Sequence, residues 1–196
     1  MDVPDLLRRA TELIPADARS DAGLGADDVR DYLGHDEWEV ALGVLEDFDG
    51  IRWQSAQYWD LLIDAAQQLW LQSDVAWLRW RRSETLNGLI RAHLRLLPPD
   101  EGGRSLPVPS DGRLRPLWSI GRTAPEGHDD LSVAAIRVES APEIPPGGSG
   151  AIRLLPLTPL HWCHLAPGDV ITMHEGRPMR GAATIIQIQF PQSGVE

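Results

Sequence analysis

The chain has 196 residues, of which 42% are hydrophobic and 24% charged, a composition that excludes wholesale disorder, collagen-like structure and membrane-embedded classes. Acidic residues outnumber basic ones by 29 to 18, so the formal charge is −11. This balance disfavours an autonomous nucleic-acid binder, because phosphate contacts need clustered basic residues. The single cysteine, Cys163, excludes an internal disulfide framework and a zinc site built from several cysteines.

We expect the chain to carry no signal peptide and no membrane span. The first residues are charged throughout and have no apolar stretch of the kind found in signal peptides. No run of residues approaches the roughly 18 apolar positions of a membrane span. We therefore expect a cytoplasmic protein with no membrane contact and no cofactor.

The first half of the chain predicts helices and carries most of the acidic excess. Pro4 suits a first helical turn, and the apolar residues that follow it recur at helical spacing. Further helices are predicted from about residue 26 to Gly34, after Asp36 as far as Gly50, and after Ser55. The last helix is predicted to begin at Ser73 and to end at prolines 98 and 99; it carries the apolar residues Val75, Trp77, Trp80, Leu86, Leu89, Ile90 and Leu94.

The second half predicts strands. Short β-branched segments at 113–121, 131–139, 150–157, 169–175 and 182–190 are separated by turns rich in Pro and Gly. Five or six such strands are typical of a small barrel or a sandwich. We expect an α+β chain with an acidic α-helical domain at 1–97, a Pro/Gly-rich linker at 98–112 and a β domain at 113–196.

One segment of the β domain resembles a known family. A strand ending in Glu175, Gly176 and Arg177 leads into a strand that begins with Gly181 and Ala182 and continues in β-branched residues. Over about residues 131 to 189 this resembles the third domain of the elongation factor Tu and 1A group. The resemblance implies a small antiparallel β-barrel, which that family uses for contacts with tRNA and exchange factors. The phosphate-binding motif GxxxxGK[ST] is missing from the sequence, so the chain is not a GTPase. A translation-associated accessory factor that binds RNA or an elongation factor is one alternative function.

The helical half resembles a different family. The stretch 29–42, VRDYLGHDEWEVAL, and the acidic residues after it resemble the MafI family of small immunity proteins. Members of that family are short acidic helical proteins that neutralise a toxin. The resemblance implies a bacterial protein-binding protein whose partner is a basic toxin domain.

Acidic residues crowd the segment from Asp27 to Asp49, where Arg30 is the only basic residue other than histidine. Such a surface can mimic phosphates and attract a basic partner, although a solvated helix face that keeps the protein soluble explains the same pattern. Trp53 is predicted to lie between helices, and we expect it to be more exposed than the other tryptophans of the helical half. The predicted partner-binding residues are Asp31, Asp36, Glu37, Glu39, Glu46, Asp47, Asp49 and Trp53.

Two other groups of residues are weaker candidates for a functional site. If the segment around residue 163 is extended, His161 and Cys163 point to one side, and His174 from a neighbouring strand could complete a zinc site. This metal-dependent enzyme is the second alternative. The arginines Arg79, Arg81 and Arg82 are interpreted as ion-pair partners of Asp74 and Glu84. With no complete catalytic set in the sequence, we expect a non-catalytic protein.

Overall fold

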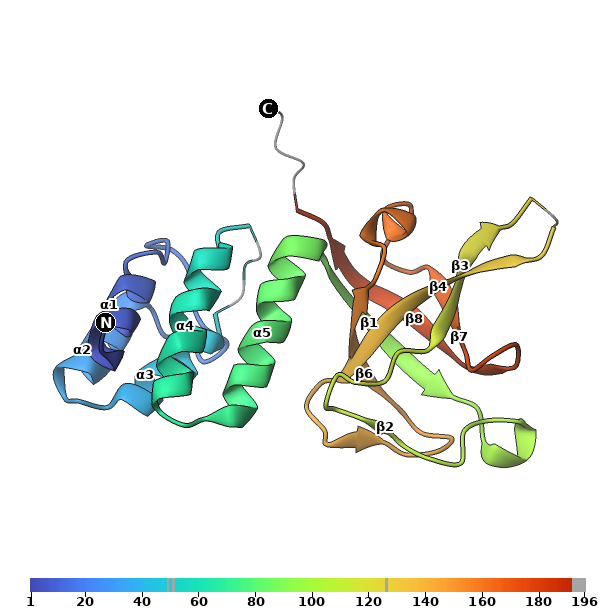
Figure 1. The fold of residues 1–196 in the computed structure, drawn as a ribbon, viewed down its shortest axis with the longest axis horizontal. Helices are drawn as coiled ribbons and strands as arrows, with labels where there is room; N and C mark the ends of the chain where they lie inside the picture. The colour runs from blue at the N-terminus through green and yellow to red at the C-terminus, as the bar shows by residue number, and fades with distance from the viewer. Residues whose placement is uncertain (49, 51, 126, 192–196) are drawn as a thin grey trace. The chain divides into compact units, whose positions relative to one another are not determined.

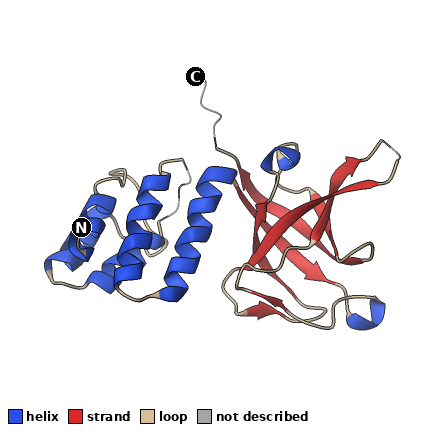
Figure 2. Cartoon of the chain, in the orientation of Figure 1, coloured by secondary structure: helices blue, strands red, loops and turns tan. Residues whose placement is uncertain are grey.

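A computed structural model describes residues 1–48, 50, 52–125 and 127–191 (Figure 1). The chain divides into two compact units, Met1–Leu86 and Asn87–Glu196. Within the described residues, the first unit is helical and the second contains a closed antiparallel barrel, as the colours of Figure 2 show. The predicted α+β class and the predicted barrel are therefore confirmed. The helical unit carries −10 of the formal charge of −11.

Five helices form within the described part of the first unit. They are α1 (Val3–Thr11), α2 (Ala26–Gly34), α3 (Trp38–Glu46), α4 (Ala56–Gln68) and α5 (Gln72–Asn87). Two predicted helix starts are confirmed by their geometry. Asp2 caps α1 ahead of Pro4 by accepting a hydrogen bond from the Asp5 amide at 3.0 Å, and Ser55 caps α4.

The core of the helical unit is apolar and aromatic. Leu7, Leu45, Trp59 and Leu62 are among its fully buried side chains. Tyr58 is also buried, and its hydroxyl donates to the Leu45 carbonyl at 2.5 Å. This bond ties α4 to α3, the helix that carries Glu39 and Glu46.

Six strands close the barrel in the order β1-β6-β4-β3-β7-β8, and every pairing is antiparallel. Their bounds are β1 (Leu89–Leu96), β3 (Leu117–Thr123), β4 (Asp129–Val138), β6 (Ser149–Pro156), β7 (Val170–His174) and β8 (Met179–Gln189). Closure abolishes the free edges that an open sheet would expose. Five of these strands match the predicted β segments.

The first barrel strand was predicted wrongly. The segment Leu89–Leu96 forms β1 and does not continue the last helix. Helix α5 ends at Asn87, and Gly88 follows with φ +105°, a backbone conformation that ends a helix. From Ile90 onward the apolar residues alternate with polar ones, so that one side of the strand fills the barrel core.

The boundary between the units accordingly falls between Leu86 and Asn87, before the segment predicted as a linker. That segment, 98–112, belongs to the second unit. It contains a short 3-10 helix η1 (Pro99–Glu101) and β2 (Val108–Pro109), which pairs with β5 (Glu143–Ile144). Arg104, from the same segment, pairs with Glu175.

Two glycines, one in the turn between β7 and β8 and one in β8, have the roles expected from the sequence. Gly176 has φ +67°, which the turn after Glu175 requires, and Gly181 lies against the neighbouring strand β1. A Cβ atom at Gly181 would lie 2.7 Å from the Arg95 carbonyl oxygen.

We therefore expect Gly181→Ala to lower the free energy of unfolding of the barrel by about 1–3 kcal/mol, as overpacking does elsewhere. Urea unfolding measures the change. Gly168→Ala is not a clean control because Gly168 has positive φ, whereas Gly43→Ala, which adds a Cβ in open space on α3, should leave the barrel unchanged. Equal stability of the Gly181→Ala protein and the original would contradict the close approach of β8 to β1.

Candidate functional site

Exposed carboxylates lie along α2 and α3, in the turn between them and at the C-terminal end of α3. We call them the acidic surface; its members are Asp27, Asp28, Asp31, Asp36, Glu37, Glu39 and Asp47, and all are exposed. Five of the residues predicted to bind a partner belong to this set. Asp49 lies outside the described residues.

The turn between α2 and α3 holds two of these acids in place. Asp36 has φ +59°, a left-handed conformation that aspartate tolerates better than most residues. The Glu37 amide then donates to the Tyr32 carbonyl at 3.0 Å and fixes the path of the turn. The backbone therefore holds Asp36 and Glu37 at the surface.

The cations near the acidic surface are already engaged with it. Arg30 pairs with Asp27 one turn earlier on α2. His35 Nδ1 lies 2.8 Å from the Asp31 carbonyl oxygen and 3.8 Å from its carboxylate. The hydrogen bond to that carbonyl, with the nearby Asp31 and Glu37 carboxylates, raises the pKa of His35 above its ordinary value. Exposed carboxylates therefore outnumber the basic side chains on the described part of α2 and α3.

Glu46, another predicted site residue, differs from the acidic surface because it is half-buried. Its Oε2 is shielded from solvent and has no hydrogen-bond partner among the described residues. The pKa of Glu46 is raised to about 7, mainly by burial and then by the neighbouring Asp74 and Asp47 carboxylates, against a smaller lowering by Arg81. Glu46 is therefore expected to change its protonation state near neutral pH, and its pKa responds to charges placed near the end of α3.

The raised pKa of Glu46 predicts a pH-dependent stability. Between about pH 4.5 and pH 7 the folded state binds more protons than the unfolded state, so the free energy of unfolding falls as the pH rises through this window. We expect Glu46→Gln to remove that fall and to stabilise the helical unit by about 2 kcal/mol at pH 8, allowing for partial exposure.

Urea unfolding at pH 4, 6 and 8, followed by helical circular dichroism, measures this effect. Glu39→Gln on the same helix is the matched control, since Glu39 is exposed and should leave the pH profile unchanged. If Glu46→Gln and the original protein have parallel pH profiles, Glu46 is ionised throughout and the interpretation is wrong.

The expectation for Trp53 was wrong. Trp53 is half-buried and packs edge-to-face against Phe48 and Tyr58, with ring centroids 6.1 Å and 5.0 Å away. The prominently exposed tryptophan is Trp70, at 84%. Trp53 therefore contributes to the core of the helical unit.

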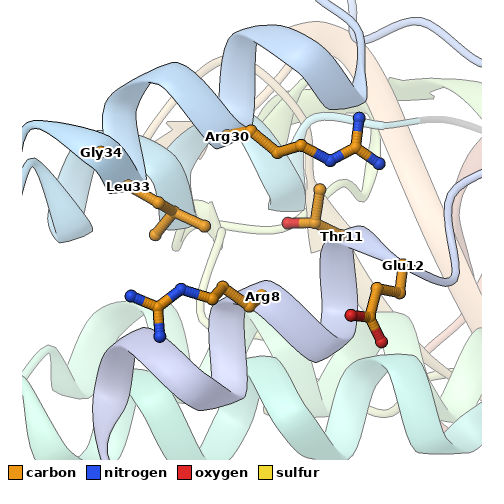
Figure 3. A pocket seen from close by; sticks show the side chains of 6 residues that line it. All are labelled: Arg8, Thr11, Glu12, Arg30, Leu33 and Gly34. Carbon is orange, nitrogen blue, oxygen red and sulfur yellow. The ribbon is translucent and has the colours of Figure 1, made fainter.

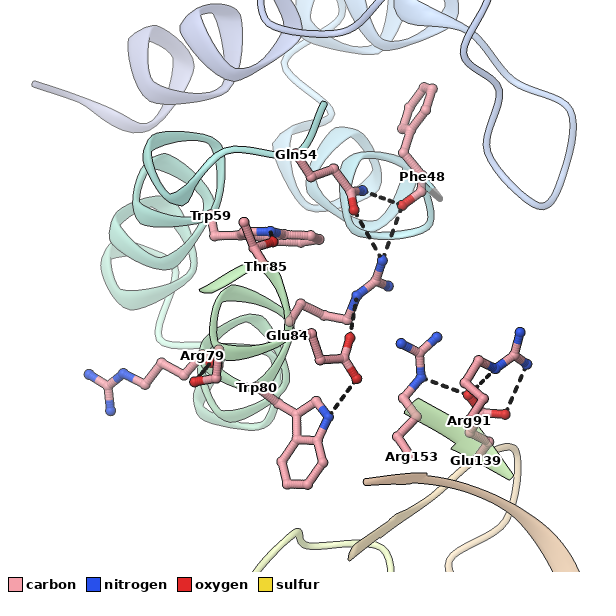
Figure 4. Close-up of polar contacts among 12 residues, drawn as sticks. Phe48, Gln54, Trp59, Arg79, Trp80, Glu84, Thr85, Arg91, Glu139 and Arg153 are labelled. Atoms are coloured by element: carbon pink, nitrogen blue, oxygen red, sulfur yellow. Dashed lines mark hydrogen bonds and ion pairs between the residues drawn. The ribbon is translucent and has the colours of Figure 1, made fainter. Parts of the chain in front are cut away.

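Two of the three α5 arginines interpreted as ion-pair partners, Arg81 and Arg82, bind carboxylates inside the helical unit. Arg81 and Glu84, both nearly buried, form an ion pair at 3.3 Å, and Arg82 binds Asp60 at 2.7 Å in place of the expected Asp74. The Arg81 guanidinium also lies 4.9 Å from the ring centroid of Trp59. Figure 4 shows Glu84 accepting from the indole of Trp80 at 2.8 Å.

The barrel unit has its own partly buried charge cluster. Glu139 accepts hydrogen bonds from Arg91 on β1 at 2.8 and 2.9 Å and from Arg153 on β6 at 2.6 Å (Figure 4). The cluster joins two neighbouring strands to the end of β4 on the outside of the barrel. The sequence signal that could have revealed it is the placement of these arginines at outward positions of paired strands.

The predicted metal site does not assemble. His161 and Trp162 lie in a 3-10 helix, η2 (Pro159–Trp162), and Cys163 follows it, so this segment is not extended. His174 ends β7, where its ring nitrogens contact the Thr172 hydroxyl and the Arg177 carbonyl. In the part of the chain that the structure describes, no group of three His, Cys, Asp or Glu residues is placed to hold a metal ion.

A pocket of about 270 Å³ lies between α1 and α2 (Figure 3). Arg8, Thr11 and Glu12 line it from α1, and Arg30 and Leu33 line it from α2. Figure 3 shows the two arginines extending toward opposite ends of the pocket. Arg8 also pairs with Asp5, and the Thr11 hydroxyl donates to the Leu7 carbonyl. The pocket therefore lacks converging polar groups, and the acidic surface is the stronger candidate site.

No protein-family model matches the chain, and a comparison with curated proteins gives no significant match. Among the described residues, the helices are all too short or too polar to span a bilayer.

Proposed function

We propose that this chain is a non-catalytic, cytoplasmic bacterial protein that binds a basic partner through its acidic surface, and that it acts as an immunity protein against a nuclease-type toxin. The observation that carries the proposal is the set of exposed carboxylates on α2 and α3, beside which Arg30 is already paired with Asp27. A domain that binds nucleic acid presents lysines and arginines to phosphates. The exposed carboxylates of this chain can bind the same lysines and arginines and so compete with nucleic acid for them.

The electrostatics of the helical unit favour fast and selective association. Its charge of −10 attracts a basic domain from a distance, and the resulting encounter rate depends on ionic strength. Glu46, with a pKa of about 7, adds a proton-linked contribution. A cation placed near the end of α3 would lower that pKa, so binding near neutral pH would release protons.

The stretch 29–42, on which the resemblance to MafI-type immunity proteins rests, runs from α2 through the acidic turn into α3. The proposal therefore assigns the partner contact to the part of the chain that carries this resemblance. The barrel would support or extend the contact.

Affinity capture from the lysate of the host, at low and high salt, tests this function. We expect capture of a large secreted protein with a small basic C-terminal domain, lost at high salt. Recovery of ribosomal proteins, elongation factors or tRNA would contradict immunity and favour a translation role.

That translation role is the second candidate, and the closed antiparallel barrel with its turn after Glu175 favours it, because the resemblance to elongation factor Tu implies such a barrel. It predicts salt-sensitive binding of bulk tRNA. A flat gel-shift titration at low salt would exclude its RNA-binding form.

A further inference from the structure

Among the residues that the structure describes, Trp70 is the one tryptophan whose side chain is largely exposed to solvent. It lies in the turn between α4 and α5 with 84% of its surface exposed, whereas every other tryptophan is buried or half-buried. Exposing a side chain of this size forfeits the hydrophobic stabilisation that its burial would bring. Neither the core nor solubility therefore accounts for a tryptophan at this position.

The backbone at Trp70 also favours a different residue. The Leu71 amide donates to the Ala66 carbonyl at 3.0 Å and the Trp70 amide to the Gln67 carbonyl at 3.2 Å, the hydrogen-bond pattern of a Schellman helix end. Trp70 occupies the left-handed position of this motif, with φ +62°, where glycine is preferred. The turn would form more easily without the indole.

The surroundings of Trp70 suit a cation. A shallow pocket of about 540 Å³ is lined by Asp64, Gln67, Gln68 and Trp70. An indole face attracts a guanidinium, and a carboxylate beside it supplies the counter-charge. The same chain uses this chemistry internally, where Arg81 lies over the Trp59 ring and pairs with Glu84.

We propose that Trp70 and Asp64 receive an arginine side chain of the basic partner protein, as a second contact point beside the acidic surface. This inference rests on the proposed function. In Figure 1 the turn between α4 and α5 and the turn between α2 and α3 both lie at the lower end of the helical unit, so one partner can meet both. A second copy of the chain is a poorer occupant, because two molecules of charge −11 repel each other.

Titration of the ¹⁵N-labelled full chain with a hexa-arginine peptide at low salt tests the proposal. We expect the indole N–H signal of Trp70, assigned by its loss in Trp70→Gly, to shift and saturate. Trp70→Gly should weaken peptide binding about fivefold, the magnitude of one exposed cation–π contact. Glycine suits the turn, so this variant is expected to fold.

Asp64→Asn should weaken binding as well, whereas the control Asp60→Asn, an exposed acid on the same helix that pairs with Arg82, should not. If the acidic-surface amides shift while the Trp70 indole does not, this inference is overturned and the acidic surface stands. If the Trp70 indole shifts and the acidic-surface amides do not, the proposed function loses its surface. Concentration-dependent Trp70 shifts without peptide would indicate self-association and overturn the arginine proposal.

Discussion

Replacing Arg81 with methionine is expected to destabilise the helical unit by about 3–5 kcal/mol, the cost of breaking a buried ion pair from one side. The side chains of Arg81 and Glu84 are only 8% and 3% exposed. Methionine preserves much of the volume but leaves the Glu84 carboxylate buried without its counter-charge. The Trp80 indole still donates to Glu84, which is a weaker compensation than a guanidinium.

Urea unfolding followed by helical circular dichroism measures this loss. Arg82→Met is the matched control, because Arg82 is the next residue and pairs with Asp60 at the surface, where such a pair contributes about 0–1 kcal/mol. Removing both charges with Arg81→Met and Glu84→Leu should recover part of the stability. Equal losses for Arg81→Met and Arg82→Met would contradict the buried role of the first pair.

Reversing the charges of Asp31, Glu37 and Glu39 to lysine is expected to weaken partner binding by about 100-fold or more. Each residue is exposed on α2, α3 or the turn between them, and the reversal replaces attraction by repulsion. A loss of about 1 kcal/mol at each site gives this factor. Glu46 is left unchanged because it is half-buried, so that its reversal would confuse binding with folding.

A matched control reverses three exposed acids of the barrel unit, Asp100, Glu101 and Glu143, which changes the net charge of the chain by the same amount. Titration calorimetry with the captured partner compares the two variants. We expect the control to bind almost as tightly as the original. Equal weakening by both variants would mean that only the overall charge matters and that the acidic surface is not a specific contact.

The fold was predictable wherever a short segment decides its own structure. The five strands after residue 113 follow from β-branched residues between Pro/Gly turns, and the starts of α1 and α4 follow from Pro4 and Ser55. Strand β1 was missed because its apolar residues, with those before Gly88, also fit a helical spacing. Its pairing with β6 and β8 decides the structure, and those strands lie far along the chain.

The sequence predicted where acidic residues crowd together along the chain, but not how deeply each of them is buried. Charge density in the sequence located Asp31, Glu37 and Glu39, which the structure leaves exposed. The sequence could not separate Glu46 from them, since its burial depends on how α3 packs. Trp53 was misjudged for a related reason, because a residue between helices can still turn inward and stack on Tyr58.

Co-expression in a heterologous host tests the central claim most directly. The basic domain of the captured partner is expressed from an inducible promoter, alone or with this chain, and growth is followed. We predict that the domain alone arrests growth. The original chain should restore growth, and so should the control with Asp100, Glu101 and Glu143 reversed. The variant with Asp31, Glu37 and Glu39 reversed should not. Full protection by that reversal variant, or no protection by the original chain, would contradict immunity through the acidic surface.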